Sequence, residues 1–236
     1  MKIQIPRFLS WVVAILIPGI IIMTALRLLL FPVFLDFEYR IPGFPEDPFG
    51  FSQEERLKYS RIIWKYVMSD AEISFLGDLH FPEGQQAPET SCQFMDDCTR
   101  LYNDRELSHM IDVQNVVQTA LRVWYVALIV LALLGIWAWR SQWMNDYLVG
   151  LVRGGWITVF LVVGILSIVV IAFGFIFVQF HNIFFEKGTW MFFTSDTLIR
   201  LFPTEFFRDM FLIVGILSAG MGILLALGLR RRIHRD

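Results

Sequence analysis

Four apolar stretches, each long enough to cross a lipid bilayer, constrain the fold of this chain more than any other feature. They cover residues from about 8–35, 118–139, 156–180 and 210–229. A membrane-spanning helix needs about 20 apolar residues. A soluble domain of 236 residues could not bury a chain that is 56% hydrophobic and only 18% charged. The sequence therefore predicts an all-α polytopic membrane protein with four transmembrane helices.

The charged residues between these stretches predict how the helices are oriented. Basic residues gather at the N-terminus (Lys2 and Arg7), in the loop 140–155 and in the tail 230–236. Residues 36–115 instead hold 16 acidic and 7 basic residues, a net charge of −9. Because positive charge favours the cytoplasmic side of a membrane, we expect both termini and the basic loop in the cytoplasm and the acidic segment outside.

The first apolar stretch is interpreted as a retained signal anchor, because its apolar core is too long for a signal peptide and no small-x-small cleavage site follows it. The expected segments are the cytoplasmic end with the first transmembrane helix (1–35), an extracytoplasmic cap (36–116), the second helix (117–139), a cytoplasmic loop (140–155), the third helix (156–180), an extracytoplasmic loop (181–209), the fourth helix (210–229) and a basic cytoplasmic tail (230–236).

The cap is expected to contain one helix and short strands. Ser52 precedes Glu55 by three residues, the spacing of a capping box, and an apolar face continues from there to Met68. Short strands are expected over residues 71–81, followed by a loop over residues 82–100.

The loop of the cap contains the only two cysteines of the chain, Cys92 and Cys98. In the oxidising compartment that the topology predicts, a disulfide between them is favoured. The alternative is a pair of free thiols. A zinc site is not expected, since it would need more ligands at closer spacing.

Two lone histidines are the main candidates for chemistry, because each is expected where a membrane helix meets the outer surface. His109 precedes the second apolar stretch, and His181 closes the third. Imidazole is the side chain whose unperturbed pKa suits proton transfer near neutrality. Glu106 and Asp112 are each three residues from His109, so on a helix either carboxylate could orient its ring. The alternative is that both histidines are merely tolerated at the interface.

Two arginines are expected just beneath the outer membrane surface. Arg27 lies 16 positions after Trp11, which corresponds to about 24 Å along a helix, and Arg122 falls at a similar height. Either these side chains extend to lipid headgroups, or they bind a substrate by gripping a lipid phosphate or polarising a carbonyl.

The predicted heights of the two histidines differ. His109 lies 13 residues above Arg122, about 20 Å along an upright helix, whereas His181 lies only a little outside the membrane core. For the two rings to meet, the second helix must tilt or bend near Asn115, or the loop over residues 182–208 must rise.

Several classes of function lack their motifs in this sequence. No serine-hydrolase elbow, phosphate-binding loop, dinucleotide fingerprint or HExxH zinc motif occurs. The basic residues are explained by membrane topology, so we expect no nucleic-acid partner. Neither a cofactor nor a resident metal is predicted, and the sequence leaves the oligomeric state open.

The chain resembles the lipoprotein intramolecular transacylases, a family of bacterial four-helix membrane proteins called Lit. The resemblance runs in the same order through most of the chain. Its motifs are Tyr39…Pro42-Gly43-Phe44-Pro45…Phe49-Gly50-Phe51…Glu55-Arg56-Leu57, Glu106-x-x-His109-Met110-x-Asp112-Val113, Phe180-His181-x-x-Phe184-Phe185…Trp190, and Leu198-Ile199-x-Leu201-Phe202-Pro203-x-x-Phe206-Phe207.

The resemblance implies that His109 and His181 are the two essential histidines of the family. It also implies that Tyr39 and Trp190 contact substrate. The implied substrate is a diacylated bacterial lipoprotein in the cell membrane, with membrane lipids as its surroundings. One acyl chain would move from the glycerol ester to the α-amine of the N-terminal cysteine, giving the lyso-form.

Nucleophile and electrophile then both belong to the substrate, so no catalytic serine or cysteine is needed. One histidine would take the amine proton, and the other would steady the tetrahedral oxyanion or protonate the leaving alcohol. The sequence does not assign these two roles.

Two other functions stay open at this point. The first is a metal-dependent membrane hydrolase that uses His80, His109, Asp112 and His181. The second is a membrane protein that binds lipids or lipoproteins without catalysing a reaction.

Overall fold

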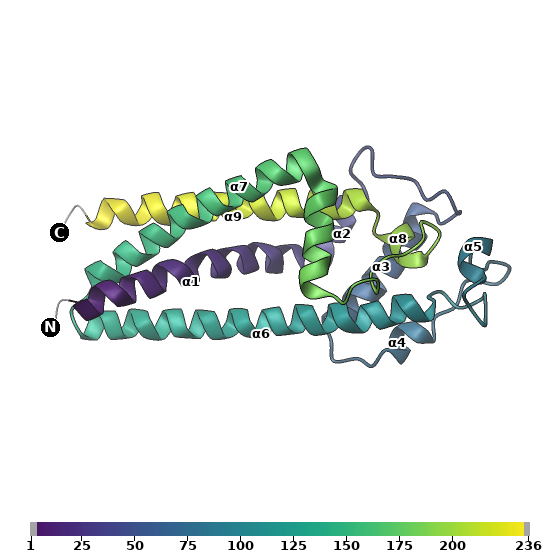
Figure 1. Ribbon diagram of the computed structural model, residues 1–236, viewed down its shortest axis with the longest axis horizontal. Helices are drawn as coiled ribbons and strands as arrows, with labels where there is room; N and C mark the ends of the chain where they lie inside the picture. Colours follow the sequence, from purple (N-terminus) through teal and green to yellow (C-terminus); the bar gives the residue numbers. More distant parts are fainter. Residues whose placement is uncertain (1–3, 234–236) are drawn as a thin grey trace. The chain divides into compact units, whose positions relative to one another are not determined.

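The computed structural model describes the backbone of residues 4–233 and the side chains of residues 5–230. Residues 234–236 of the basic tail, His234 among them, lie outside the described part of the chain. The helices of the described part, labelled in Figure 1, are α1 (Gln4–Leu29), α2 (Pro32–Glu38), α3 (Gln53–Val67), α4 (Ser74–Gly77), α5 (Glu89–Cys92), α6 (Asp104–Arg140), α7 (Met144–Phe184), α8 (Thr197–Leu201) and α9 (Thr204–Ile233).

These helices are divided between two compact units. The first, which we call the helix unit, contains the described residues up to 30, residues 120–172 and the described residues from 210 onward. The second contains residues 31–119 and 173–209. We call it the site unit, because it holds both His109 and His181.

Four helices are long and apolar enough to cross a membrane: Ile5–Leu29, Asp104–Arg140, Met144–Phe184 and Thr204–Arg230. Many of their aliphatic side chains are exposed in the protein itself, as expected for surfaces that face lipid. The predicted all-α polytopic membrane fold is confirmed. The first apolar stretch, however, does not form one helix to residue 35, because α1 ends at Leu29 and α2 begins with Pro32, a residue suited to the first turn of a helix.

The helix unit is packed through glycines at helix crossings. A Cβ atom on Gly154 of α7 would lie 2.5 Å from the Ile17 Cβ of α1. A Cβ atom on Gly155 would lie 2.7 Å from the Gly222 carbonyl oxygen of α9. Small residues let helix backbones approach this closely. In lipid, burial of apolar surface does not drive helices together, so they associate through such close van der Waals packing. Gly222 and the fully buried Ser218 of α9 therefore serve packing within the chain.

The site unit contains the predicted helix of the cap, which is observed as α3. Its N-terminal residue Ser52 accepts a hydrogen bond from the Glu55 amide, and the Glu55 carboxylate accepts one from the Ser52 amide, so the predicted capping box is confirmed. Buried side chains on α3, including Tyr59, Ile63 and Tyr66, pack into the apolar core of this unit.

The strands expected over residues 71–81 are not found in the described part of the chain. Residues Ser74–Gly77 form the single helical turn α4 instead. What remains of the expected pairing is one isolated antiparallel bridge between His80 and Arg100. Apolar and polar residues do alternate over much of this segment, but the backbone amides of Phe75, Leu76 and Gly77 bond to carbonyls three or four residues before them. Alternation along one segment does not supply the paired strands that a stable sheet needs.

Candidate functional site

His109 lies in the second turn of α6, whose start is fixed by a reciprocal pair of hydrogen bonds. The Asn103 side chain accepts a hydrogen bond from the Glu106 amide (3.0 Å), and the Glu106 carboxylate accepts one from the Asn103 amide (2.8 Å). This is a capping box with asparagine in the place of serine. The position of His109 is therefore set by local chemistry three residues before it.

His181 lies near the end of α7, in a segment that follows a break in the helix. Ala172 has φ −145° and ψ 53°, which are not helical values, and residues after it belong to the site unit. Gly174, two residues later, has a low helix propensity that favours such a break. Of the alternatives left open for bringing the rings together, a bend near Asn115 is not found: α6 runs without interruption from Asp104 to Arg140, and the break lies in α7.

The site unit brings the two histidines together. Their ring centroids are 6.4 Å apart, and the ring planes differ by only 21°. Each residue is only 8% exposed. Two side chains separated by 72 positions in the sequence thus share one largely enclosed site.

Aromatic rings surround both imidazoles. Around His109, the ring centroids of Phe185 and Phe192 lie at 4.8 Å and 5.3 Å. Around His181, those of Phe177 and Trp190 lie at 4.1 Å and 4.8 Å. An apolar lining of this kind excludes water and strengthens hydrogen bonds made inside it.

The hydrogen bonding of the two histidines differs. His181 Nδ1 lies 2.7 Å from the carbonyl oxygen of Phe177. A carbonyl can only accept, so Nδ1 carries the proton, and the neutral ring has its free lone pair on Nε2. His109 Nδ1, in contrast, is buried and has no hydrogen-bond partner among the described residues.

The two carboxylates expected to orient His109 do not do so through hydrogen bonds. Glu106 is almost fully buried and accepts hydrogen bonds from the Asn103 amide and, at 2.7 Å, from the Leu198 amide. It therefore joins the start of α6 to the start of α8. Asp112 is half-buried, and no hydrogen bond to His109 is found for it within the described residues.

The segment that carries Phe192 is anchored by Asp196, a residue that sequence analysis missed. Its fully buried carboxylate accepts hydrogen bonds from the side chains of Ser91 (2.8 Å) and Asn103 (3.1 Å) and from the Phe193 amide (2.9 Å). Arg105 adds an ion pair at 3.3 Å. In the sequence, Ser195-Asp196-Thr197 is typical of the start of a helix. The sequence around Asp196 does not indicate that its carboxylate binds Ser91 and Asn103, which lie far away in the chain.

Cys92 and Cys98 form a disulfide in the loop that supplies Ser91. The loop is also attached by a hydrogen bond from the Ala87 amide to the Cys98 carbonyl. Next to it, the rings of Phe94 and Phe193 stack with centroids 5.4 Å apart. The disulfide thus closes a loop that packs against the segment leading to the site.

Tyr39 is expected to contact substrate, but its hydroxyl group already has partners within the protein. Tyr39 is 1% exposed, and its hydroxyl hydrogen-bonds the Ser60 Oγ (2.5 Å) and the Leu201 carbonyl. Burial raises the pKa of Tyr39 to about 12. Through these two hydrogen bonds Tyr39 joins α3 to the end of α8, and its contact with substrate stays a prediction.

The other residues expected to bind substrate are divided between the units. Trp190 lies in the site unit beside His181, with its Nε1 atom buried. Arg27, in the last turn of α1, is half-buried, and Arg122 of α6 is exposed. Both arginines belong to the helix unit, and their part in substrate binding stays a prediction.

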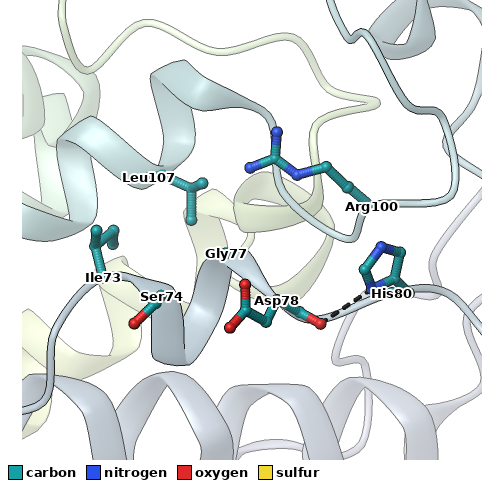
Figure 2. Close-up of a pocket in the computed structure, with 7 residues that line it drawn as sticks. All are labelled: Ile73, Ser74, Gly77, Asp78, His80, Arg100 and Leu107. Atoms are coloured by element: carbon teal, nitrogen blue, oxygen red, sulfur yellow. Dashed lines mark hydrogen bonds between the residues drawn. The ribbon is translucent and has the colours of Figure 1, made fainter.

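His80 does not join the other histidines. It is exposed and lines a surface pocket of about 430 Å³ (Figure 2) with Ile73, Ser74, Gly77, Asp78, Arg100 and Leu107. Its Nδ1 lies 3.0 Å from the Asp78 carbonyl oxygen, the contact dashed in Figure 2. Within the described residues, no three His, Cys, Asp or Glu side chains gather as metal ligands, so the arrangement needed for a metal-dependent hydrolase is not found.

Comparison with known proteins gives two sequence matches. The family model described as "Lipoprotein intramolecular transacylase Lit" matches residues 11–207 of this chain. A protein of Aquifex aeolicus (strain VF5), described only as uncharacterized, is 31% identical over 223 residues, which are 92% of this chain and 91% of the relative.

Solved structures share the fold of the whole chain. The membrane integral lipoprotein intramolecular transacylase Lit from Bacillus cereus superposes with a TM-score of 0.72 at 19% identity, covering 98% of this chain and 97% of that one. The same protein with a histidine-to-alanine mutation gives a TM-score of 0.68 at 18% identity, with coverage of 98% and 95%.

Proposed function

The chain belongs to the lipoprotein intramolecular transacylase (Lit) family, and from this premise we propose how its two histidines carry out the reaction. The protein is a membrane acyltransferase that forms lyso-form lipoprotein. It moves an acyl chain from the diacylglyceryl ester of a bacterial lipoprotein to the α-amine of the N-terminal cysteine. We propose that His181 is the base of this transfer and that His109 stabilises the charge that develops on oxygen.

The hydrogen bond between His181 Nδ1 and the Phe177 carbonyl carries this assignment. It holds the tautomer whose Nε2 atom is free to accept a proton, and it fixes the plane of the ring. A base must have its lone pair available in the resting protein, and His181 meets that condition. The role corresponds to that of the histidine in serine hydrolases, where a partner on one ring nitrogen sets the other as the base.

His109 has the complementary property. Its Nδ1 atom is buried with no partner, so a proton on this nitrogen would be available to a substrate oxygen. Its ring centroid lies 6.4 Å from that of His181. We propose that both imidazoles contact the same reacting group. Hydrogen-bond donors already in place where charge develops contribute strongly to catalysis.

The proposed reaction balances within the substrate. The amine nitrogen attacks the ester carbonyl carbon, a C–N bond forms, and the carbonyl oxygen becomes negatively charged. His181 Nε2 takes the amine proton. When the intermediate collapses, the bond between the acyl carbon and the glycerol oxygen breaks, and the imidazolium of His181 returns the proton to that oxygen.

The apolar surroundings suit this chemistry. A free α-amine has a pKa of about 8, so part of it is protonated at neutral pH. A low-dielectric site disfavours the ammonium form and so favours the neutral nucleophile. Because amine and ester belong to one molecule, holding them in contact supplies a further part of the rate.

We also propose that the histidines face the outer side of the cell membrane, with both termini in the cytoplasm. The net charge of −9 on residues 36–115 supports this orientation, as do the basic residues near both termini. The diacylated lipoprotein would then reach the site from the outer leaflet, and membrane lipids would surround the exposed apolar helices. Labelling of a Gln85→Cys variant from outside in intact cells tests the orientation, and labelling only after permeabilisation would contradict it.

The proposed roles are tested by converting diacyl lipoprotein to the lyso-form and following the product by mass spectrometry. We expect His181→Ala and His109→Ala each to lower conversion about 100-fold or more. The double variant should be no slower than the slower single variant, because groups that act as a unit have non-additive effects. His80→Ala, a third outer-segment histidine that is exposed, should convert like the unmodified protein.

Near-normal conversion by folded His181→Ala or folded His109→Ala protein would contradict the proposed roles. Loss of conversion on adding a chelator, restored by a divalent metal, would instead favour metal-dependent chemistry. A protein that binds lipoprotein but never converts it would support a binding function.

A further inference from the structure

We propose that the indole N–H of Trp190 is a further catalytic group, which donates a hydrogen bond to the carbonyl oxygen of the ester as that oxygen becomes negatively charged. The inference rests on the acyl transfer proposed above and adds to it a donor that no histidine supplies. Three observations support it: the state of the Trp190 Nε1 atom, its neighbours, and the way its segment is held.

The Trp190 Nε1 atom is buried and has no hydrogen-bond partner among the described residues. An indole nitrogen can only donate, so no rotation or change of protonation gives it another use. Buried donors without a partner cost free energy and are rare in native proteins, so each one needs an explanation. A substrate oxygen that arrives in the site would supply the missing partner.

The ring of Trp190 lies directly beside the proposed base. Its centroid is 4.8 Å from that of His181, with 39° between the planes, and it meets the Phe177 ring edge-on at 6.4 Å. Phe177 is also the residue whose carbonyl holds His181 Nδ1. The proposed donor and the proposed base therefore lie side by side in one aromatic cluster.

A second tryptophan shows why the neighbours matter. Trp143 also has a buried Nε1 atom without a partner among the described residues, but it lies in the helix unit. Its ring contacts are with Trp137 and Tyr147, at 5.7 Å and 6.1 Å, and neither group can act as a base at neutral pH. An unpartnered indole alone therefore indicates nothing, whereas one beside a histidine with a free lone pair indicates a reacting site.

The chain before and after Trp190 is held so that the indole has a defined place. Gly188 has φ +91°, a conformation that favours glycine, in the turn closed by the Thr189 amide and the Glu186 carbonyl (3.2 Å). After Trp190, the Phe193 amide is bound by the buried Asp196. A donor fixed before the reaction needs little reorganisation as charge develops.

The proposed donor acts mainly on the tetrahedral intermediate. The ground-state ester carbonyl carries only a partial charge, whereas the intermediate carries a full one after the amine has attacked. A hydrogen bond that strengthens between these two states raises kcat and leaves KM nearly unchanged. This separates the proposal from a purely structural or substrate-binding role of the indole.

The experiment replaces the indole N–H with sulfur by site-specific incorporation, Trp190→3-benzothienylalanine, which keeps almost the same ring shape. With diacyl lipoprotein as the probe, we expect kcat to fall about 100-fold, the scale seen when one oxyanion donor is removed, and KM to change less than about 3-fold. Trp190→Phe, which also lacks the N–H, should show the same division between kcat and KM. Trp143→3-benzothienylalanine is the matched control and should convert normally.

A kcat within about 3-fold of the unmodified protein in folded Trp190→3-benzothienylalanine would overturn the proposal. So would a rise in KM with unchanged kcat, which would assign Trp190 to binding alone. If the sulfur variant does not fold, the same outcomes are read from Trp190→Phe. Failure of the unmodified protein to convert lipoprotein, or normal conversion by His181→Ala, would instead contradict the proposed function.

Discussion

The interior of the helix unit and the interior of the site unit are stabilised by different interactions. In the helix unit, Val13, Ile17 and Ile21 form a buried apolar core, and glycines bring helix backbones together. In the site unit, charged groups lie in the interior: Glu106 and Asp196 are almost fully buried, and their partners come from distant parts of the chain.

The difference follows from what each unit has to do. Helices that face lipid gain little from burying apolar surface and associate by close van der Waals contact. A catalytic site must instead hold its groups in a defined geometry, and directional bonds to buried carboxylates do this better than apolar contact. The site unit should therefore be sensitive to the loss of single polar atoms, and the helix unit to added volume.

The largest expected effect comes from removing the central carboxylate of the site unit. Asp196→Ala should lower the free energy of unfolding by about 3–5 kcal/mol, because it leaves the donors of Asn103 and the Phe193 amide without their acceptor. Chemical denaturation in detergent measures the change. Asp104→Ala, at an exposed aspartate, should cost less than about 1 kcal/mol. Equal effects of the two variants would remove the contrast between buried and exposed carboxylates.

A smaller effect is expected from opening the disulfide. The double variant Cys92→Ser, Cys98→Ser should lose about 2 kcal/mol, because the closed loop is short and restrains the unfolded chain only modestly. Conversion of lipoprotein should persist, since the cysteines contact neither histidine. Complete loss of conversion in protein that is still folded would show that the loop does more than stabilise.

Added volume tests the helix unit. Gly155→Ala places a Cβ atom 2.7 Å from the Gly222 carbonyl oxygen, so the helices must shift. Overpacking costs about 1–3 kcal/mol, and alanine recovers about 1 kcal/mol of helix propensity, which leaves a net loss of up to about 2 kcal/mol. Gly164→Ala, in the same helix with no atom within 4 Å of its Cβ position, should be neutral or stabilising. Thermal unfolding midpoints that fall equally for both would argue against glycine-mediated packing.

The smallest effect is expected at Tyr39, which was expected to contact substrate but whose hydroxyl has two partners within the protein. Tyr39→Phe removes a hydroxyl that bonds Ser60 and the Leu201 carbonyl, and it should cost about 1 kcal/mol of stability. Conversion of folded protein should be unchanged, because that hydroxyl does not reach substrate. A fall in kcat of more than about 10-fold, with stability unaltered, would show that the Tyr39 hydroxyl acts on the substrate.

Local patterns in the sequence were enough for much of the fold. Spanning helices are counted from consecutive apolar residues, and α3 is read from the three-residue spacing of Ser52 and Glu55. The choice of His109 and His181 came from their place at helix ends. Each of these features depends on neighbours within a few positions, which a single sequence displays directly.

Two features could not be predicted in this way: the conformation of residues 71–81, and which of the alternatives left open brings the two histidine rings together. Both required knowledge of what packs against the segment, and the chain formed α4 and a break at Ala172. Glu106 was close to His109 in sequence, yet its carboxylate binds the Leu198 amide, 92 positions away. Spacing along a helix shows which side chains are near one another, but it does not show with which partner each of them forms its hydrogen bond.

The sequence by itself determined that this protein has four membrane-spanning helices, because apolar length is a property of the chain alone, and it singled out His109 and His181 as the candidates for its chemistry. Only the tertiary structure decided that His181 has its free lone pair on Nε2, that Asp196 anchors the segment before α8, and that Trp190 lies beside His181 with an N–H that has no partner among the described residues. The physical reason is that a hydrogen bond exists only between atoms within about 3 Å in the right direction, and which distant residues meet that condition is settled by packing.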